Sequence, residues 1–267
     1  MRYYRWNEAG EDKDLAILPH REICSDFGDF SATFAALSLL GKGDMSHGQE
    51  ASMGRREKLY EDLGIPGAWV YSPPLKHTRE ATILRGFPDP EAWRAEMLNQ
   101  GGSDGALAPG AGIETRPKGI AVTVADCMPI WFFDRRLGAF GLLHSGWKGT
   151  GILAQAAASM EGEFGSSMED LLAILGPAIG SCCYRVDETR AGIFSREFGS
   201  SAVTIRESGD GKLFSLNLRE ANLRLAEGLG IGAVLNWELC TACSSNLGSF
   251  RRQGGEGFTR MLALAVG

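Results

Sequence analysis

Histidine is scarce in this sequence of 267 residues, which contains only His20, His47, His77 and His144. A centre that binds several metal ions through imidazole ligands is therefore hard to build. Long apolar runs are absent too, since no stretch approaches the roughly 18 apolar residues of a membrane-spanning helix. Residues 1–8 are polar and lack the apolar core of a secretory signal. We therefore expect a cytoplasmic protein without a membrane partner.

Positive charge is not in excess, because 27 lysines and arginines stand against 33 aspartates and glutamates. A broad nucleic-acid surface usually needs an excess of basic residues, so we expect no nucleic-acid partner. The net charge of −6 still allows a small anion to bind in a locally basic pocket. The six cysteines are expected to be thiols or metal ligands, as is usual in a reducing compartment.

Apolar periodicity predicts a mixture of helices and strands. We expect strands over residues 15–18, 35–40, 68–71, 78–84, 119–125, 129–133, 138–143, 171–175, 233–236 and 261–266. We expect helices over residues 50–63, 88–99, 150–164, 187–198 and 218–229. Asp187 is the expected N-cap of the fourth helix. Residues 1–14 are interpreted as a polar surface segment, and residues 101–118 as a loop.

The order of these elements predicts the fold class. Strands follow one another in adjacent runs as well as alternating with helices, which does not favour a doubly wound parallel sheet. No linker, repeat or low-complexity tract divides the chain. We therefore expect one α+β domain over residues 1–267, with mixed β-sheets flanked by helices.

Two short segments in the middle of the chain carry reactive side chains. Cys127 lies at the junction between two apolar strands, and His144 ends the strand that follows their hairpin turn at residues 134–138. A tight hairpin brings the end of its second strand beside the start of its first, so both side chains are expected at one rim of a sheet. A thiolate and an imidazole are good zinc ligands, and they also form a nucleophile–base pair. A buried core cysteine and a strand-end histidine are the plain structural alternative.

Four blocks of sequence carry a family resemblance. They are Ala-Asp-Cys-Met-Pro at residues 125–129, His-Ser-Gly-Trp-Lys-Gly-Thr at 144–150, Gly-Pro-Ala-Ile-Gly-Ser-Cys-Cys-Tyr at 176–184, and a C-terminal set at 240–241, 249–252 and 259–260. In this order and spacing they make the chain similar to the laccase-domain family, also called polyphenol oxidase, peptidoglycan editing factor or purine nucleoside phosphorylase. The resemblance covers most of the chain and implies the α+β laccase-domain fold.

The resemblance implies a metal site with three protein ligands, which are His77, Cys127 and His144 in this sequence. The family motif around the first histidine is usually Gln-Val-His-Gly, whereas residues 75–78 read Leu-Lys-His-Thr. His47 is the rival by local sequence, but His77 follows the helix and strand that normally precede the motif. Three ligands leave one zinc position open, as in catalytic zinc sites. Zinc is the expected metal, and copper is the alternative.

The resemblance further implies an enzyme that acts on purine nucleosides. Phosphorolysis splits adenosine, inosine, guanosine or methylthioadenosine into a base and a sugar phosphate such as ribose 1-phosphate, and deamination converts adenosine into inosine and ammonia. Arg55, Lys148 and Arg251 are the cations expected around phosphate, although each can also be a solvated charge. Asp126, beside Cys127, is expected to take part in catalysis by orienting a ligand. We expect a monomer with small-molecule partners only.

Other function classes remain open at this point. Cys127 as nucleophile and His144 as base, without metal, would make an amidase or hydrolase that edits peptidoglycan precursors. Copper-dependent oxidation of phenols needs ligands for several copper ions, which four histidines hardly supply. A non-catalytic partner in cell-wall synthesis is the remaining class. His77 separates the first hypothesis from the zinc enzyme, because only a metal site requires it.

Two further patterns are weak signals. Residues 149–154 fit a dinucleotide fingerprint, but a short loop separates them from the preceding strand, where the fingerprint should begin. Cys240 and Cys243 form a lone Cys-x-x-Cys pair, and a four-cysteine zinc site needs a second pair. Cys182 and Cys183 are adjacent in sequence and are expected to be poorly placed for that role.

Overall fold

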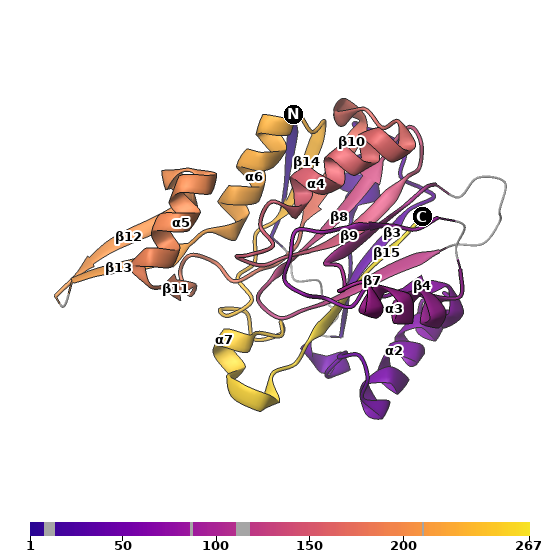
Figure 1. Cartoon of the computed structure of the whole chain (residues 1–267), viewed down its shortest axis with the longest axis horizontal. Coiled ribbons are helices and arrows are strands. Elements are labelled where there is room, and N and C mark those ends of the chain that lie inside the picture. Colours follow the sequence, from indigo (N-terminus) through magenta and orange to yellow (C-terminus); the bar gives the residue numbers. More distant parts are fainter. Residues whose placement is uncertain (8–13, 86–87, 111–117, 210) are drawn as a thin grey trace.

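A seven-stranded mixed β-sheet is the largest part of the computed structural model (Figure 1), which describes residues 1–7, 14–85, 88–110, 118–209 and 211–267. In spatial order its strands are β1 (Arg2–Trp6), β14 (Ala233–Trp237), β10 (Leu171–Leu175), β8 (Met128–Asp134), β9 (Phe140–Ser145), β6 (Gly105–Ala108) and β5 (Thr82–Ile83). Strands β1, β14 and β10 pair in parallel, whereas β10, β8, β9 and β6 pair antiparallel.

Two smaller sheets complete the strand framework. The five-stranded sheet contains β2 (Leu15–Ile17), β3 (Phe34–Ser38), β15 (Met261–Val266), β7 (Gly119–Val124) and β4 (Val70–Tyr71), in that spatial order. The three-stranded sheet contains β11 (Arg185–Val186), β13 (Gly211–Leu216) and β12 (Val203–Ser208). Figure 1 shows the hairpin of β12 and β13 extending away from the body of the molecule.

Helices connect and cover these sheets. Those in the described residues are α1 (His20–Ile23), α2 (Glu50–Asp62), α3 (Pro90–Asn99), α4 (Ile152–Ser159), α5 (Glu188–Phe198), α6 (Leu218–Leu229) and α7 (Phe250–Gln253). A π-helical turn at Met160–Phe164 continues α4. Asp187 caps α5 by accepting a hydrogen bond from the N–H of Arg190, as expected. Within the described residues, no helix has the length and apolar character needed to cross a membrane.

Alternating side chains on the large sheet divide the core into two layers. Trp131 and Phe133 of β8 pack with the five-stranded sheet, whereas Ile130 and Phe132 pack with α4, α5 and α6. This alternation follows from the two-residue period of a strand. The indole N–H of Trp131 donates a 2.9 Å hydrogen bond to the carbonyl of Leu264 and joins the two sheets. Helix α2 packs on the outer face of the five-stranded sheet. Mixed sheets flanked by helices therefore make an α+β fold, as predicted.

The structure corrects several expectations about single elements. Residues 2–6 form strand β1 rather than a surface segment, because they pair with β14 at the edge of the large sheet. Residues 105–108, expected in a loop, form β6 between β9 and β5. The remaining parts of the two expected irregular segments include residues 8–13 and 111–117, which lie outside the described residues.

Candidate metal and substrate site

Three side chains from separate segments meet at one rim of the sheets. Strands β8 and β9 pair so that Pro129 lies opposite His144, which places Cys127 next to that histidine. His77 lies in the connection between β4 and β5. The ligand atoms of His77, Cys127 and His144 all lie within 4.8 Å of one another, and the two imidazole centroids are 5.0 Å apart. The hairpin thus brings Cys127 and His144 together, and His77 joins them.

A buried carboxylate, that of Asp104, holds two of these three residues. Its Oδ1 lies 3.0 Å from Nδ1 of His144 and accepts a 2.9 Å hydrogen bond from the backbone N–H of His77. Its Oδ2 accepts hydrogen bonds from the backbone N–H and the hydroxyl of Thr78, at 2.6 and 2.8 Å. Asp104 has no exposed surface. Because Nδ1 is held by this carboxylate, His144 has Nε2 free to face Cys127 and His77.

The close approach of Cys127 and His144 changes the pKa of both groups. Burial by itself raises the pKa of the Cys127 thiol, but the neighbouring His144 and His77 imidazoles lower it to about 6. Burial by itself lowers the pKa of His144, but the Cys127 thiolate and the Asp104 carboxylate raise it to about 10. Cys127 is therefore a thiolate at neutral pH, which is the form that binds metal ions and acts as a nucleophile.

Two glycines leave space for this arrangement. A Cβ at Gly146 would lie 2.8 Å from Sγ of Cys127, and a Cβ at Gly149 would lie 2.8 Å from the carbonyl oxygen of Thr78. Both contacts are shorter than real Cβ atoms make. A side chain at Gly146 would thus displace the cysteine, and one at Gly149 would displace the loop of His77. His77 itself has a φ of 58°, a conformation that is costly for a non-glycine residue and recurs at functional sites.

A cavity of about 540 Å³ opens onto the three ligands. This volume lies in the usual range for small-molecule sites. Much of its wall is aliphatic or aromatic, with contributions from Leu75, Ile179, Tyr184, Leu218, Phe250 and Phe258. Burial raises the pKa of Tyr184 to about 12, so its phenol keeps the proton at neutral pH and can donate a hydrogen bond. The cavity therefore suits a small, partly apolar molecule with a few polar groups.

Three arginines give this cavity a positive wall in an otherwise acidic protein. They are Arg190 of α5, Arg251 of α7, and Arg260 directly before β15. Arg190 stacks its guanidinium over Trp147, with Cζ 4.7 Å from the ring centroid. Arg251 donates to the carbonyl of Cys183 at 2.9 Å, which fixes its direction. Because the guanidinium fork matches the geometry of oxyanions, the cavity can bind a phosphate or carboxylate.

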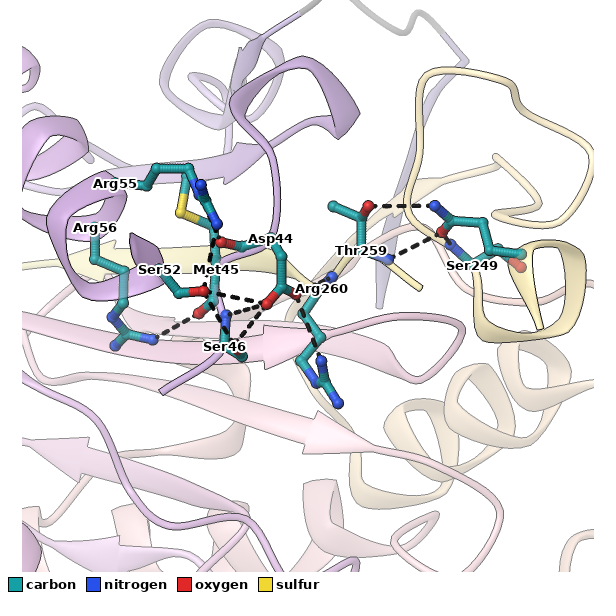
Figure 2. A network of polar contacts seen from close by, with 10 residues as sticks. Asp44, Met45, Ser46, Ser52, Arg55, Arg56, Ser249, Thr259 and Arg260 are labelled. Atoms are coloured by element: carbon teal, nitrogen blue, oxygen red, sulfur yellow. Dashed lines mark hydrogen bonds and ion pairs between the residues drawn. The ribbon is translucent and has the colours of Figure 1, made fainter. Parts of the chain in front are cut away.

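Asp44 holds Arg260, as Figure 2 shows, and Arg260 lines the cavity. Its Oδ1 accepts a 2.9 Å hydrogen bond from the backbone N–H of Arg260 and lies 3.5 Å from the guanidinium. Its Oδ2 accepts hydrogen bonds from the hydroxyls of Ser46 and Ser52, at 2.5 and 3.3 Å. Arg55 donates through Nε to the Asp44 carbonyl, at 3.0 Å. Arg55 therefore supports the residue that positions Arg260 and does not itself line the cavity.

The other residues that the sequence singles out are distributed around the site. Asp126 lines the cavity, and its carboxylate accepts hydrogen bonds from the Thr241 hydroxyl and the Arg251 backbone N–H, both at 2.6 Å. The carboxylate that contacts His144 is thus Asp104 and not Asp126. Lys148 lines a separate depression beside α5. His47 lines another cavity, next to α2 and α3, and is not part of the ligand cluster.

Asp104, Arg190 and Arg260 belong to the site, although none of them is among the predicted site residues. Asp104 lies in a glycine-rich stretch that reads as a loop, so no neighbouring residue marks it. Arg190 follows the helix cap Asp187 and has the sequence context of an ordinary surface residue on a helix. Arg260 ends the Thr-Arg block that carries part of the family resemblance, and this block is the one signal that could have identified it.

Residues 40–266 match the family described as multi-copper polyphenol oxidoreductase laccase. The chain belongs to this family. The matched range contains the three clustered ligands and all three arginines of the cavity wall. The resemblance that the four sequence blocks indicate is therefore confirmed.

Individual relatives support the same assignment. A purine nucleoside phosphorylase of Borreliella burgdorferi is 35% identical over 130 residues, which are 48% of this chain and 56% of that protein. Adenosine deaminase RL5, from an unknown prokaryotic organism, is 30% identical over 206 residues, or 74% of this chain and 76% of that protein. The crystal structure of YlmD from Geobacillus stearothermophilus is similar, with a TM-score of 0.73 and 26% identity over 88% of this chain and 92% of that chain. The chain spans about half the length of the Borreliella protein.

Proposed function

We propose that this protein is a zinc-dependent purine nucleoside phosphorylase. Its substrates would be phosphate and adenosine, inosine, guanosine or methylthioadenosine, and its products a purine base and a sugar 1-phosphate. One observation carries the proposal: a single cavity of about 540 Å³ combines three clustered metal ligands, three arginines and an aromatic wall. The name of the Borreliella burgdorferi relative, purine nucleoside phosphorylase, supports the same substrate class.

Zinc fits the donor atoms of His77, Cys127 and His144. Two imidazoles and one thiolate are ligands that tetrahedral zinc prefers, and three protein ligands leave the fourth position open. The thiolate state of Cys127 and the carboxylate of Asp104 behind His144 are both usual in zinc sites. When bound, zinc supplies a Lewis acid at the wall of the cavity.

A centre with several copper ions fits the chain less well. His20 is buried, and its ring nitrogens lie 3.1 Å from the Leu18 carbonyl and 2.9 Å from the Thr33 hydroxyl. His47 lines a different cavity. Only two of the four histidines therefore remain for the site, whereas imidazole is the usual ligand of such copper ions. This donor set supports a centre with one metal ion.

The three arginines of the cavity wall would bind the phosphate. In phosphorolysis a phosphate oxygen forms a bond to C1′ of the sugar while the bond from C1′ to N9 of the purine breaks, and the purine leaves with that electron pair. Arg190, Arg251 and Arg260 would neutralise the phosphate and hold it in line with the breaking bond. The protonated phenol of Tyr184 would donate a hydrogen bond to an oxygen or ring nitrogen in the same cavity.

The aromatic wall of the cavity would bind the purine base and exclude water from the site. The rings of Phe250 and Phe258 meet edge to face, with centroids 5.0 Å apart at 87°. Their flat surfaces, together with Leu75, would pack against the base. A base held in this way leaves less room for water near C1′, which favours phosphate over water as the nucleophile.

Adenosine deamination is the second reaction that we propose for this cavity. Adenosine deaminase RL5 aligns with 74% of this chain. In that reaction water adds at C6 of the purine and ammonia leaves, so phosphate is not consumed. The requirement for phosphate therefore separates the two reactions in one experiment.

Chromatography of nucleosides after incubation with the pure, zinc-loaded protein tests this proposal. We expect phosphate-dependent formation of adenine from adenosine and of hypoxanthine from inosine, and phosphate-independent formation of inosine from adenosine. Asp29→Asn is the control variant, because Asp29 is exposed and distant in sequence from the site residues. If folded, zinc-loaded protein releases neither base nor inosine, the proposal is wrong.

A metal-free hydrolase is the alternative that a specific observation favours. In space, the Cys127 thiolate faces the His144 imidazole, which in turn contacts the Asp104 carboxylate. This is the arrangement of an activated nucleophile, its base and the group that orients the base. This chemistry does not need His77. The zinc enzyme predicts that His77→Ala loses bound zinc and nucleoside cleavage together, whereas the hydrolase predicts that His77→Ala keeps amidase activity on a peptidoglycan precursor.

A further inference from the structure

A second cluster of metal-ligand side chains lies outside the cavity. The thiols of Cys182, Cys183, Cys240 and Cys243 all lie within 4.8 Å of one another. Sγ of Cys243 is 3.4 Å from Sγ of Cys183 and 3.6 Å from Sγ of Cys182. The expectation that the adjacent Cys182 and Cys183 are poorly placed to complete a four-cysteine site is therefore wrong, because the fold brings them to Cys240 and Cys243.

Backbone hydrogen bonds hold the two cysteine segments together. Ala178 and Cys240 form a parallel β-bridge, and the N–H of Thr241 donates to the Ala178 carbonyl at 3.1 Å. The segment of Cys182 and Cys183 curls into a turn in which the N–H of Cys183 donates to the Gly180 carbonyl at 2.9 Å. This turn explains how two adjacent cysteines reach the same pair of partners.

The spacing of the sulfur atoms agrees with a tetrahedral ion. Four sulfurs, each about 2.3 Å from one zinc ion, lie about 3.8 Å apart. The observed 3.4 and 3.6 Å are close to this separation. The backbone N–H of Gly180 also donates to Sγ of Cys240 at 3.2 Å, a contact that favours a thiolate. A Cβ at Gly180 would lie 3.2 Å from Sγ of Cys182, so glycine leaves room for this close approach.

A half-buried arginine, Arg219, supplies positive charge beside the segment that carries Cys240. Four thiolates around one zinc ion leave a net negative charge. Arg219 interacts electrostatically with Glu238 and Tyr3 and, more weakly, with Cys240 and Cys182, and its Nε has no hydrogen-bond partner among the described residues. Its Nη2 donates to the carbonyls of Trp237 and Leu239, which keeps the guanidinium in place. A fixed cation beside a negative centre stabilises that centre.

We propose that this second cluster binds one zinc ion as a closed structural site, with the ligands Cys182, Cys183, Cys240 and Cys243. Four protein thiolates fill the tetrahedral coordination of zinc and leave no position for a substrate, which is the pattern of structural zinc. Cys182 and Cys243 are exposed, so the ion can enter from solvent.

The position of this cluster connects it with one wall of the cavity. Tyr184 directly follows Cys183, and Arg251 donates to the carbonyl of Cys183 at 2.9 Å. Tyr184 and Arg251 both line the cavity. A zinc ion at the cluster would therefore hold the segment of residues 182–185 against the loop of residues 240–243 and keep both side chains in position.

The number of zinc ions bound per chain tests this proposal directly. After expression with zinc and removal of free metal, we expect two zinc ions per chain. Cys127→Ala and Cys243→Ser should each leave one, and the combined variant none. Cys24→Ala is the matched control and should keep two, because Cys24 is a buried free cysteine outside both clusters. If the proposed catalytic centre binds no zinc, the wild type should contain one ion per chain, and Cys243→Ser should still lose that ion. Failure of the proposed function can therefore be distinguished from failure of this proposal.

Cobalt(II) substitution gives a second readout that does not depend on folding of the Cys243 variant. In Cys127→Ala loaded with cobalt, the four-thiolate site predicts strong sulfur-to-cobalt charge-transfer absorption. No metal bound to folded Cys127→Ala would overturn the proposal. A protein purified without air that is lighter by two hydrogen atoms, with Cys183 and Cys243 joined as a disulfide, would overturn it as well.

Discussion

Asp104 and His144 are joined side chain to side chain, with Oδ1 of the aspartate 3.0 Å from Nδ1 of the histidine. They are also joined through the backbone, because the N–H of His144 donates to the Asp104 carbonyl at 2.7 Å. The same carboxylate binds the backbone N–H of His77. One buried residue therefore sets the relative position of two proposed zinc ligands that are far apart in sequence.

Replacing this carboxylate by an amide should weaken the metal site. In Asp104→Asn the side chain keeps its size, but it loses the charge that holds the Nδ1 proton of His144. Such partners of metal ligands typically contribute about 10- to 100-fold in metal affinity or activity. We expect a loss of this size in zinc affinity, measured by competition with a chelator, and in kcat for phosphorolysis. Unchanged zinc affinity in Asp104→Asn would show that Asp104 has only a structural role.

A side chain at Gly146 should weaken metal binding, because a Cβ there would lie 2.8 Å from Sγ of Cys127. Overpacking of this kind costs about 1–3 kcal/mol, which corresponds to about 5- to 150-fold in binding. We expect Gly146→Ala to lose zinc affinity by a factor in this range while the protein remains folded. Gly54→Ala is the matched control, since nothing lies within 4 Å of a Cβ at Gly54 of α2. Alanine there should stabilise the helix by about 0.5–1 kcal/mol.

The arginine wall should determine the KM for phosphate. Arg190→Gln and Arg251→Gln each remove a charged donor, and hydrogen bonds to charged groups contribute about 1.5–3 kcal/mol. We expect KM for phosphate to rise about 10- to 150-fold in each variant, with a smaller change in KM for inosine. Arg206→Gln, an exposed change on β12, should alter neither value.

Lys148 gives a further comparison, because it lines a separate depression and not the cavity. Steady-state kinetics of Lys148→Gln should show a smaller rise in KM for phosphate than Arg251→Gln does. A larger rise for Lys148→Gln would place phosphate in the depression beside α5 instead.

Acid should destabilise the protein through His20. Burial lowers the pKa of this imidazole to about 4, from an ordinary value of 6.5. The unfolded chain therefore binds the proton more readily, and stability falls as the pH drops from about 6.5 towards 4. The shift corresponds to a loss of about 3 kcal/mol in the free energy of unfolding when complete.

Urea denaturation at several pH values checks this prediction. His20→Gln should have a flatter dependence on pH than the wild type over this interval, whatever its absolute stability. His47→Gln is the comparison variant, because burial also lowers the pKa of His47 to about 4. Parallel curves for wild type and His20→Gln would contradict the assignment of the acid sensitivity to His20.

Local patterns in the sequence account for the centre of the molecule. The apolar runs around residues 119–143 and their hairpin predict β7, β8 and β9, and with them the approach of Cys127 to His144. The amphipathic spacing of residues 218–229 predicts α6 with its bounds. These elements can be predicted from the local sequence, because their buried residues recur with the period of the strand or helix that they form.

Other elements depend on partners that a local pattern does not contain. Strand β1 has a charged and aromatic sequence, and it becomes a strand because the edge of β14 is available to it. Strands β12 and β13 are largely exposed and show little apolar alternation. The four-cysteine cluster needs Cys182–Cys183 and Cys240–Cys243 side by side, which only the tertiary fold provides.

The most direct test of the proposed activity is phosphorus NMR of inosine and inorganic phosphate incubated with the zinc-loaded protein. The phosphorylase predicts a new ribose 1-phosphate resonance that grows together with an equal amount of hypoxanthine, and that is absent with His77→Ala. Hypoxanthine together with free ribose, or an unchanged phosphate resonance in the presence of folded, zinc-loaded protein, would contradict it.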